Sequence, residues 1–463
     1  MDRRDFSRAV LAAALTGFGA SMPGARAQPA QAATDESIDL MLEEMVAETG
    51  GMPPLTAFGP DEIKKDEALR KAIVERVGKK LPDLTKVATL KPPPHHSIDK
   101  AHLGSDEAAL GSDFPLDGAL LQNLARANGF LETFTYSFRL GAPQADLVLF
   151  GLRGCEIVDP KDVGVFKPSI RLKVGVVDHV RMLCTMGIWD RKANTVAAFH
   201  ASTVPHLAFV EVYRIYLALR GRVARTDVAS LAATDALLDA STGSNWYSNT
   251  LSQGLHIHYI GPHGGKQPNM LRQSDDWFAP VARAKTVLGF TNSDWESPGA
   301  AVCDNIHAAY DLNPKAVIGY QSNGCNVISG SVSGGKYSGE IATYRNLLSL
   351  DQLGRKDKTI VGAKANQKFF YMLLSGAEAC LQSKRPGDAA LDRVRFGSTG
   401  AKAVALRKLL ESVGHKTLVK RDPKDIVGRG TVEALRKEQE AVGQAKDGVL
   451  SKGRAAELGV PWA

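Results

Sequence analysis

The feature that most constrains the fold is a long series of short apolar segments between about Leu120 and Leu381, bounded by Gly, Pro or Asp. Segments of this length are typical of β-strands. The clearest are Ala145 to Leu152, Ile170 to Val177, Met182 to Trp189, Thr195 to His200 and Phe209 to Leu217. A chain of 463 residues also exceeds the size at which single cores stop growing, about 250 to 300 residues. We predict a mixed α and β protein whose β-rich domain covers residues 120–385.

Helical periodicity flanks this β-rich region on both sides. Before it, apolar residues recur at helical spacing, and the run Lys91-Pro92-Pro93-Pro94 then stops any helix. After it, one apolar period ends at Gly414, and a second runs through Val432, Leu435 and Val442. The sequence therefore predicts a helical N-terminal region with a Pro-rich linker over 28–119 and a small separate all-α domain over 395–463.

The first 27 residues have the three parts of a signal peptide. Arg3-Arg4-Asp5-Phe6 precedes an apolar stretch from Ala9 to Ala20, and Ala25-Arg26-Ala27 forms a cleavage site. The paired arginines with Phe6 resemble a twin-arginine signal. The apolar stretch is too short for a stable membrane span. We expect export to the periplasm or cell envelope; the alternative is a basic amphipathic helix on a cytosolic protein.

Charge and cysteine content narrow the remaining possibilities. The net charge of +7 comes from 57 basic and 50 acidic residues that are interspersed, which argues against nucleic acid as a partner. In an oxidising compartment an odd number of cysteines suggests one reactive thiol. If one is reactive, the other four could form up to two disulfides in three pairings, or none. The five are Cys155, Cys184, Cys303, Cys325 and Cys380.

The strongest chemical signal is the segment Asp304-Asn305-Ile306-His307 followed, 18 positions after the histidine (325 minus 307), by Cys325. A cysteine of ordinary pKa is only a few per cent thiolate at neutral pH, so a nucleophile needs a partner that takes its proton. His307 is the natural candidate for that base. Asp304, Asn305 or a backbone carbonyl could orient its ring.

The residues before the cysteine read as a tight turn. Gly324 allows the backbone to turn directly ahead of Cys325, and the N–H groups of both residues could then face a developing oxyanion. Ser322 and Asn323 would hold the turn through side-chain hydrogen bonds. We interpret Cys325, His307 and Gly324 as the catalytic set, with the substrate contacts assigned to Ser322, Asn323, Asn305 and His263.

The histidine and the run Ser322-Asn323-Gly324-Cys325 resemble the motif of the L,D-transpeptidase family. The resemblance extends to Trp189–Lys192 and Ala201–Thr203, which look like an early hairpin and a substrate edge. It implies a β-rich catalytic domain in which the two residues meet from adjacent strands. The chain departs from the family's motif in three places, while the nucleophile and the base are intact: Asn323 replaces a second histidine, Ala308 a glycine, and Val327 the usual Asn or Arg.

The C-terminal segment resembles a peptidoglycan-binding module of three short helices. Val427-Gly428-Arg429-Gly430-Thr431, Gln439 and Asp447-Gly448-Val449 fall where that module has turn and core residues. Arg407 stands where the module usually has Gln, and the usual aromatic of the second helix is missing. A generic helical cap is the alternative interpretation.

A second cluster consists of His256, His258 and His263. Alternating histidines on a strand share one face, and a metal could use that spacing. No Cys, Asp or Glu with suitable ligand spacing accompanies them, so we expect a polar strand at the rim of the cleft and no metal. His263, in a Gly- and Pro-rich loop, would line the substrate groove.

Together with these residues, the resemblance implies a cysteine acyltransferase that cross-links peptidoglycan stem peptides through a thioester on Cys325, without a metal or organic cofactor. Two alternatives stay open. Water could take the thioester, which would give a carboxypeptidase or endopeptidase. The catalytic-like domain could also be inactive, as part of a wall-binding scaffold. A Cys325 sulfur that is buried, or beyond reach of both His307 ring nitrogens, would favour the scaffold.

Overall fold

The computed structural model describes the chain from residue 111 to 462, with gaps. The signal segment 1–27, the region 28–110 with its Pro-rich linker, the segment Phe209–Leu217, Cys303 and Asn323 lie outside the described residues. Those described are 111–136, 143–178, 181–206, 248–263, 267–273, 280–284, 294–296, 304–309, 322, 324–333, 336–350, 354–356, 359–361, 367–444 and 446–462.

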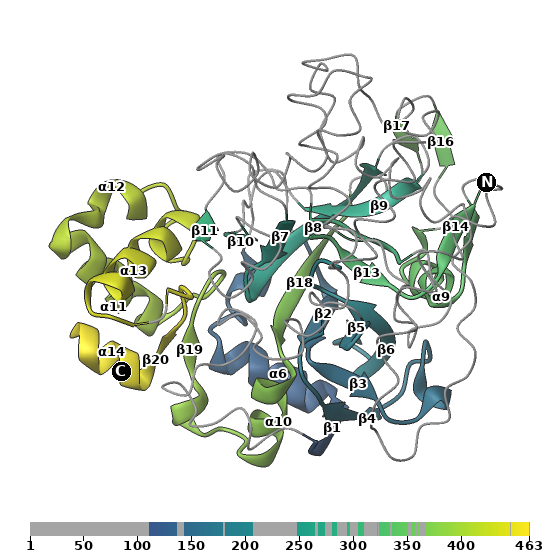
Figure 1. Ribbon diagram of the computed structural model, residues 1–463, viewed down its shortest axis with the longest axis horizontal. Helices are drawn as coiled ribbons and strands as arrows, with labels where there is room; N and C mark the ends of the chain where they lie inside the picture. Colours follow the sequence, from purple (N-terminus) through teal and green to yellow (C-terminus); the bar gives the residue numbers. More distant parts are fainter. Residues whose placement is uncertain are drawn as a thin grey trace, which may run out of the picture.

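Eight strands close into a barrel, which forms the centre of the molecule (Figure 1). Neighbours run antiparallel except for two parallel pairs, β12 with β13 and β18 with β2. The predicted β-rich domain in a mixed α and β protein is confirmed. In barrel order the strands are β12 (Ile306–Ala308), β13 (Asn326–Ile328), β6 (Thr195–Ser202), β5 (Cys184–Asp190), β2 (Gln144–Arg153), β18 (Lys368–Ser375), β8 (Gly254–His263) and β9 (Gln267–Gln273).

The central strands are apolar along most of their length because both of their faces are covered. All eight residues of β18 are buried, and so are the last six of β2. Continuous apolar runs of this kind are expected where a sheet is covered on both sides. The predicted segment Met182 to Trp189 forms β5, which turns into β6 through a tight hairpin. In that turn Asn194 has φ 56° and the Ala193 N–H donates to Asp190 Oδ1 at 2.8 Å.

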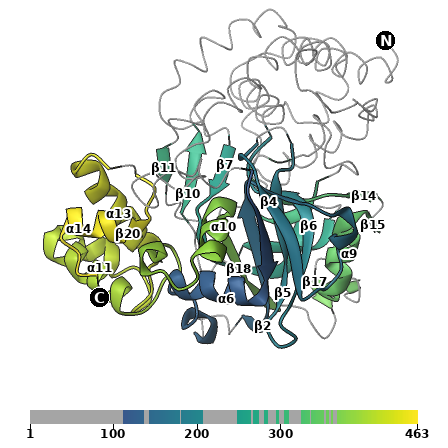
Figure 2. The ribbon, with the colours of Figure 1, turned by 90° about the horizontal axis from the view of Figure 1, so that it is seen from below.

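A small sheet and two helices cover one side of the barrel (Figure 2). The sheet has the order β1 (Asp113–Asp117), β4 (Ser169–Val174), β3 (Cys155–Ile157). Helix α6 (Gly118–Ala127) begins where Asp117 accepts the Leu120 N–H at 2.7 Å, and α10 (Gly376–Lys384) begins where Ser375 accepts the Glu378 N–H at 3.1 Å. Both N-terminal caps are residues of the preceding strand, so strand and helix join without a loop.

The remaining elements of the β-rich region are short. They are β7 (Ser248–Leu251), β10 (Val281–Ala284) and β11 (Asp294–Glu296) in one sheet, the pairs β14 (Ser331–Ser333) with β15 (Lys336–Ser338) and β16 (Gly354–Lys356) with β17 (Thr359–Val361), the helix α9 (Glu340–Leu347), and the 3₁₀ turns Thr133–Thr135, Pro160–Asp162 and Ala389–Leu391.

The C-terminal part consists mainly of helices, and its short strand β20 pairs with β19. Gly414, at φ 102°, interrupts the first helical run. Val413 and Val442 are 47% and 51% exposed, so these two residues of the predicted apolar pattern do not belong to the core. Leu406 and Leu435 are fully buried. The elements are β19 (Arg393–Val394), α11 (Ala401–Leu410), the π-turn Glu411–His415, α12 (Lys416–Val419), α13 (Arg429–Ala441), β20 (Leu450–Ser451) and α14 (Lys452–Leu458).

Arg407 and Asp422 together organise the start of α13. The Arg407 guanidinium donates to the carbonyls of Ile426 at 2.6 Å and Val419 at 3.3 Å. The N-cap Gly428 has no side chain, and Asp422 takes over its function by accepting the N–H groups of Gly430 and Thr431 at 2.8 and 2.6 Å. The arginine that departs from the module pattern therefore has a structural role.

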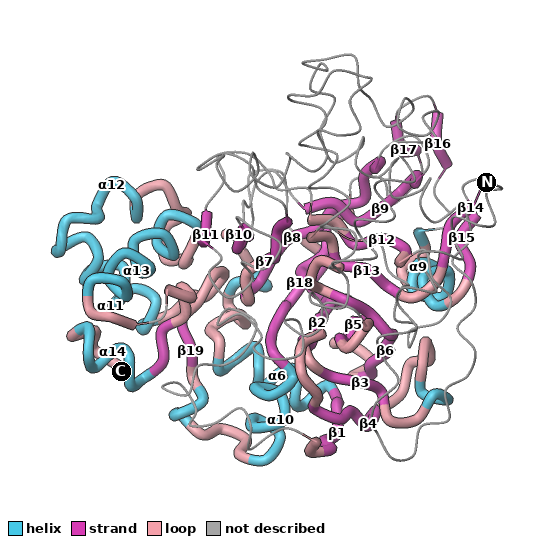
Figure 3. The backbone as a smooth tube through the Cα atoms, in the orientation of Figure 1, coloured by secondary structure: helices cyan, strands magenta, loops and turns pink. Residues whose placement is uncertain are grey.

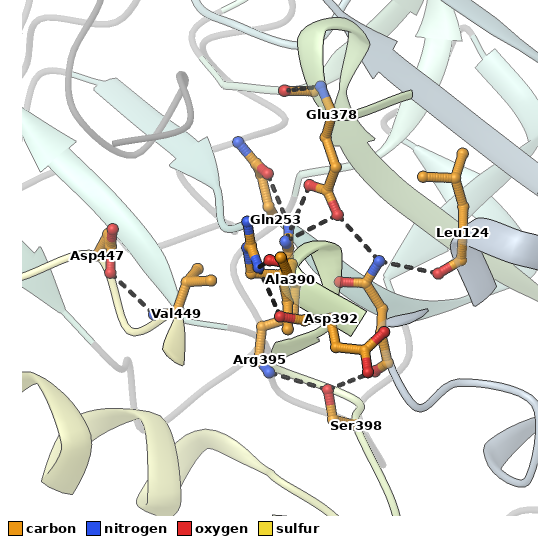
Figure 4. A network of polar contacts seen from close by, with 12 residues as sticks. Leu124, Gln253, Glu378, Ala390, Asp392, Arg395, Ser398, Asp447 and Val449 are labelled. Atoms are coloured by element: carbon orange, nitrogen blue, oxygen red, sulfur yellow. Dashed lines mark hydrogen bonds and ion pairs between the residues drawn. The ribbon is translucent and has the colours of Figure 1, made fainter. Parts of the chain in front are cut away.

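The helical part shares a buried polar network with the barrel side (Figure 4). Arg395 donates to both carboxylate oxygens of Glu378 at 3.0 and 2.9 Å and to Gln253 Oε1 at 2.8 Å. Ser398 donates to the Asn128 carbonyl at 2.6 Å, and the Leu255 N–H donates to Phe396 O at 2.9 Å. Because these groups are buried, the predicted separate tail is anchored directly on the strand β8 and the helices α6 and α10.

Candidate functional site

The segments that carry His307 and Cys325 are brought together by one ladder of the barrel, where β12 pairs in parallel with β13 (Figure 3). In this register Ile306 lies opposite Asn326, and His307 lies opposite Val327. Cys325 precedes Val327 by two positions. Cys325 directly precedes the first residue of β13, so the ladder brings the segments that carry His307 and Cys325 side by side.

The residues before the sulfur form the predicted tight turn. Gly324 has φ 154°, a backbone conformation that residues with a side chain rarely adopt. The Ser322 hydroxyl donates to the Cys325 carbonyl at 2.7 Å and accepts the Gly324 N–H at 3.1 Å. Ser322 therefore holds the turn, and the Gly324 N–H has a partner other than the oxyanion that the sequence interpretation assigned to it.

The thiol receives a hydrogen bond from the strand beside it. The backbone N–H of Asn305 donates to Cys325 Sγ at 3.4 Å. A hydrogen bond of this kind favours the charged thiolate, whereas the complete burial of the sulfur favours the neutral thiol. The segment next to the histidine thus contacts the sulfur through its main chain.

His307 is oriented by a backbone carbonyl, one of the three possibilities that the sequence leaves open. Its Nδ1 lies 2.7 Å from the carbonyl oxygen of Ala308. A carbonyl can only accept, so Nδ1 carries the proton in the neutral ring, and Nε2 is then the nitrogen with a lone pair. That tautomer is the one a base acting through Nε2 requires.

The family's polar position after the cysteine is apolar here. Val327 packs with Met182 and Ala309 in a small buried cluster of its own. The side chain opposite His307 therefore serves packing, and any substrate contact made by that position in the family has no counterpart at this residue.

Both residues of the pair are buried. Cys325 is 0% exposed and His307 is 1% exposed, and Ser322, Asp304 and Asn305 around them are buried as well. A nucleophile has to meet the carbonyl carbon that it attacks. The burial of the sulfur satisfies one of the two conditions that would favour an inactive scaffold.

The alternating histidines occupy the interior of the barrel, so the predicted polar rim strand is wrong. His256 and His258 are fully buried on β8. His256 Nε2 lies 2.8 Å from Ser252 O, and His258 Nε2 lies 3.2 Å from Asp304 O. Burial lowers the pKa of His256 to about 3 and that of His258 to about 4, so both rings are neutral near pH 7. His263 belongs to β8, and its side chain lies outside the described residues.

Several polar residues near the site were not predicted from the sequence. Tyr371 on β18 donates to Asn326 Oδ1 at 3.2 Å, beside the nucleophile. Arg153 on β2 donates to Thr203 Oγ1 at 3.0 Å and to Leu251 O at 2.6 Å, and burial lowers its pKa to about 10. His206 donates its N–H to Ser322 O at 2.9 Å. The sequence signal for Tyr371 and Arg153 was a single polar residue inside an apolar strand. Burying such a side chain is costly unless it has a hydrogen-bond partner.

The described residues contain no group of three or more His, Cys, Asp or Glu that could hold a metal ion. No disulfide joins Cys155, Cys184, Cys325 and Cys380 to one another. Within the described part of the chain, no helix has the length and apolar character needed to cross a membrane.

No protein-family model, curated protein or solved structure matches the chain.

Proposed function

We propose that the chain is a cysteine acyltransferase that acts on peptidoglycan stem peptides by L,D-transpeptidase-type chemistry. The observation that supports the proposal is the parallel ladder that joins the segments of His307 and Cys325, together with the Asn305 N–H on the sulfur. The tautomer set by the Ala308 carbonyl adds to it, because it leaves Nε2 as the proton acceptor.

In this chemistry His307 Nε2 takes the proton of Cys325, and the thiolate attacks the carbonyl carbon of a stem-peptide bond. The tetrahedral intermediate collapses to a thioester as the C–N bond breaks. The terminal D-residue leaves with the proton from the imidazolium. An amine of a neighbouring stem then attacks the thioester, forms the new amide bond and returns the thiol. No metal or organic cofactor enters these steps.

The segments before and after the β-rich region would determine where the enzyme is located. Residues 1–27 would direct export to the periplasm or cell envelope by the twin-arginine route. Residues 395–463 would hold the enzyme on the wall polymer. The exposed lysines of that helical part, among them Lys416 and Lys420, suit an anionic polymer.

A second candidate is a wall-binding scaffold without activity, and the burial of the Cys325 sulfur is the observation that favours it. If the enzyme reading is right, substrate or an acylating probe has to gain access to the sulfur. The two candidates therefore differ in whether a folded protein reacts at Cys325.

The deciding experiment combines the full chain with a donor stem peptide and an acceptor amine. Cross-linked dimer that depends on Cys325 supports the transpeptidase, whereas released D-residue without dimer identifies a hydrolase. A folded protein that gives neither product, and no adduct with an activated acyl donor, would establish the scaffold.

A further inference from the structure

The side chains of Tyr371, His256 and His258 form a row on one face of the ladder between β18 and β8, inside the barrel. In the antiparallel ladder of β18 and β8, Tyr371 lies opposite His256, and Phe369 lies opposite His258. Paired residues point to the same face, so Tyr371, His256 and His258 share it. The His258 ring stands edge-on to Tyr371 with 5.2 Å between centroids, and the His256 ring lies 6.1 Å away.

Two members of this row contact the segments that form the candidate site. The Tyr371 hydroxyl donates to the side chain of Asn326, the residue that follows Cys325. His258 Nε2 lies 3.2 Å from the carbonyl of Asp304, the residue that precedes Asn305. A carbonyl accepts, so the neutral His258 ring donates from Nε2.

The two segments are also bonded to each other at the sulfur. The Asn326 N–H donates to Asn305 O at 2.8 Å, and the Asn305 N–H donates to Cys325 Sγ at 3.4 Å. A shift of either segment would therefore change the direction of the Asn305 N–H that reaches the sulfur.

The sequence leaves room for the tyrosine hydroxyl at one neighbouring position. A Cβ on Gly151 would lie 2.4 Å from the Tyr371 oxygen and 3.0 Å from Leu373 Cδ1. Gly151, in the middle of the apolar strand β2, therefore leaves open the space that the Tyr371 hydroxyl needs where it donates to Asn326.

We propose that Tyr371 and His258 are positioning residues that hold, from inside the barrel, the two backbone segments carrying Cys325 and its N–H donor. This inference rests on the proposed function for its effect on chemistry. It assigns to the barrel interior the task of aligning the Asn305 N–H with the sulfur, and it predicts that loss of the Tyr371 or the His258 contact makes the thiolate harder to form.

The first test compares Tyr371→Phe with Tyr344→Phe in the full chain. Both changes remove a buried tyrosine hydroxyl, but the Tyr344 hydroxyl has no hydrogen-bond partner among the described residues and its ring packs on Phe199. We expect adduct formation at Cys325 with a carbapenem to slow about five- to tenfold in Tyr371→Phe and to stay within about twofold in Tyr344→Phe.

A pH profile separates positioning from a general loss of stability. Weakening the N–H contact with the sulfur should raise the pH at which adduct formation is half-maximal, by about half a unit in Tyr371→Phe. A variant that is merely less stable would show a lower amount of folded protein with an unchanged midpoint.

The second test changes the ability of the side chain at position 258 to donate a hydrogen bond. Glutamine can still donate an amide N–H to the Asp304 carbonyl, so His258→Gln should keep more of the rate than His258→Leu. His256→Leu is the matched control, because His256 is equally buried but contacts Ser252 O at the end of the strand instead. Its pH midpoint should equal that of the wild type.

Hydrogen exchange distinguishes failure of this inference from failure of the proposed function. Peptides covering 304–309 and 324–328 should exchange faster in Tyr371→Phe and His258→Leu than in the two controls. Faster exchange in a protein that never forms an adduct would refute the acyltransferase and leave the holding role intact. Equal exchange and equal pH midpoints in Tyr371→Phe and Tyr344→Phe would overturn the positioning role.

Discussion

The backbone N–H of Asn305, the residue directly before β12, points at Cys325 Sγ, 3.4 Å away, and Cys325 itself directly precedes the parallel strand β13. The position of the Cys325 sulfur therefore depends on the hydrogen bonds between the two segments as well as on the turn formed by Ser322 and Gly324. Since His307 lies two positions after Asn305, one segment supplies both the donor to the thiolate and the proposed base.

Replacing the two central residues should have unequal effects on acylation. Cys325→Ala should abolish the carbapenem adduct, since an alanine methyl group cannot form a thioester. His307→Ala should slow it by about 100- to 10,000-fold without removing it, because a small thiolate fraction persists near neutral pH. Intact-mass spectra over time measure both. An adduct that persists in folded Cys325→Ala would place the reactive group elsewhere.

The buried histidines should make the fold sensitive to mild acid. Burial depresses the pKa of His256 to about 3 and of His258 to about 4, below an unfolded value of about 6.5, so the unfolded chain binds more protons as the pH falls below 6.5. Each histidine should cost about 2 kcal/mol of the free energy of unfolding at pH 5, relative to pH 7. Urea unfolding at the two pH values measures the loss. His258→Gln should remove about half of it, and an unchanged loss would contradict the assignment.

The pair formed by Arg395 and Glu378 should be worth far more to stability than a surface pair. Both side chains are buried, so Glu378→Ala leaves an uncompensated charge and should lower the free energy of unfolding by about 3 to 5 kcal/mol. Arg171→Ala is the control, because its pair with Asp113 is 64% and 40% exposed, and it should cost less than about 1 kcal/mol. Denaturant midpoints that fall equally would show that the anchor contributes no more than a surface contact.

Wall binding should be tested with the intact chain, because truncation from Gly397 would remove Ser398 and Thr399, which donate to the carbonyls of Asn128 and Gly129 directly after α6. Lys416→Glu with Lys420→Glu changes the charge of the exposed helical surface and should weaken pelleting with purified wall sacculi severalfold. Lys161→Glu with Lys173→Glu changes the net charge of the protein equally on exposed residues elsewhere and is the matched control. Equal pelleting by both double variants would remove the binding assignment.

Export should depend on the paired arginines Arg3 and Arg4. Replacing both by lysine keeps the charge but removes the feature that resembles a twin-arginine signal, so the precursor should remain in the cytosol. Cell fractionation and the size of the protein measure this. A single change of Arg8 to lysine is the control, and mature protein in the envelope from the double variant would refute the route.

Local patterns were enough to predict the strands that became β2, β4, β5 and β6, and the turn at Gly324. These elements are specified within ten residues or fewer, by apolar runs and turn residues. The interior position of His256 and His258 was not predictable in this way. Their alternation is visible in the sequence, but which face of β8 turns inward is decided by its register with β18, more than 100 positions later.

Contacts between residues that are close in the sequence could be predicted at the site. Contacts that form only when the barrel strands pair could not. Ser322 and Gly324 lie next to Cys325, and their turn follows from residue type. Tyr371 reaches Asn326 only after β18 has paired with β2 and β8. A lone tyrosine inside an apolar run gives a weak signal, because its partner is set by the closed sheet.

The parallel pairing of β18 with β2 also bears on when the protein becomes folded. Tyr371 lies opposite Leu149, 222 positions earlier (371 minus 149), and β18 joins β2 to β8 at the centre of the barrel. Contacts between such distant residues have a high loop-closure cost and form slowly. The barrel cannot close until β18 has been synthesised, so newly made chains carry an open sheet edge for most of translation. An unpaired sheet edge of this kind is prone to aggregation until β18 completes the barrel.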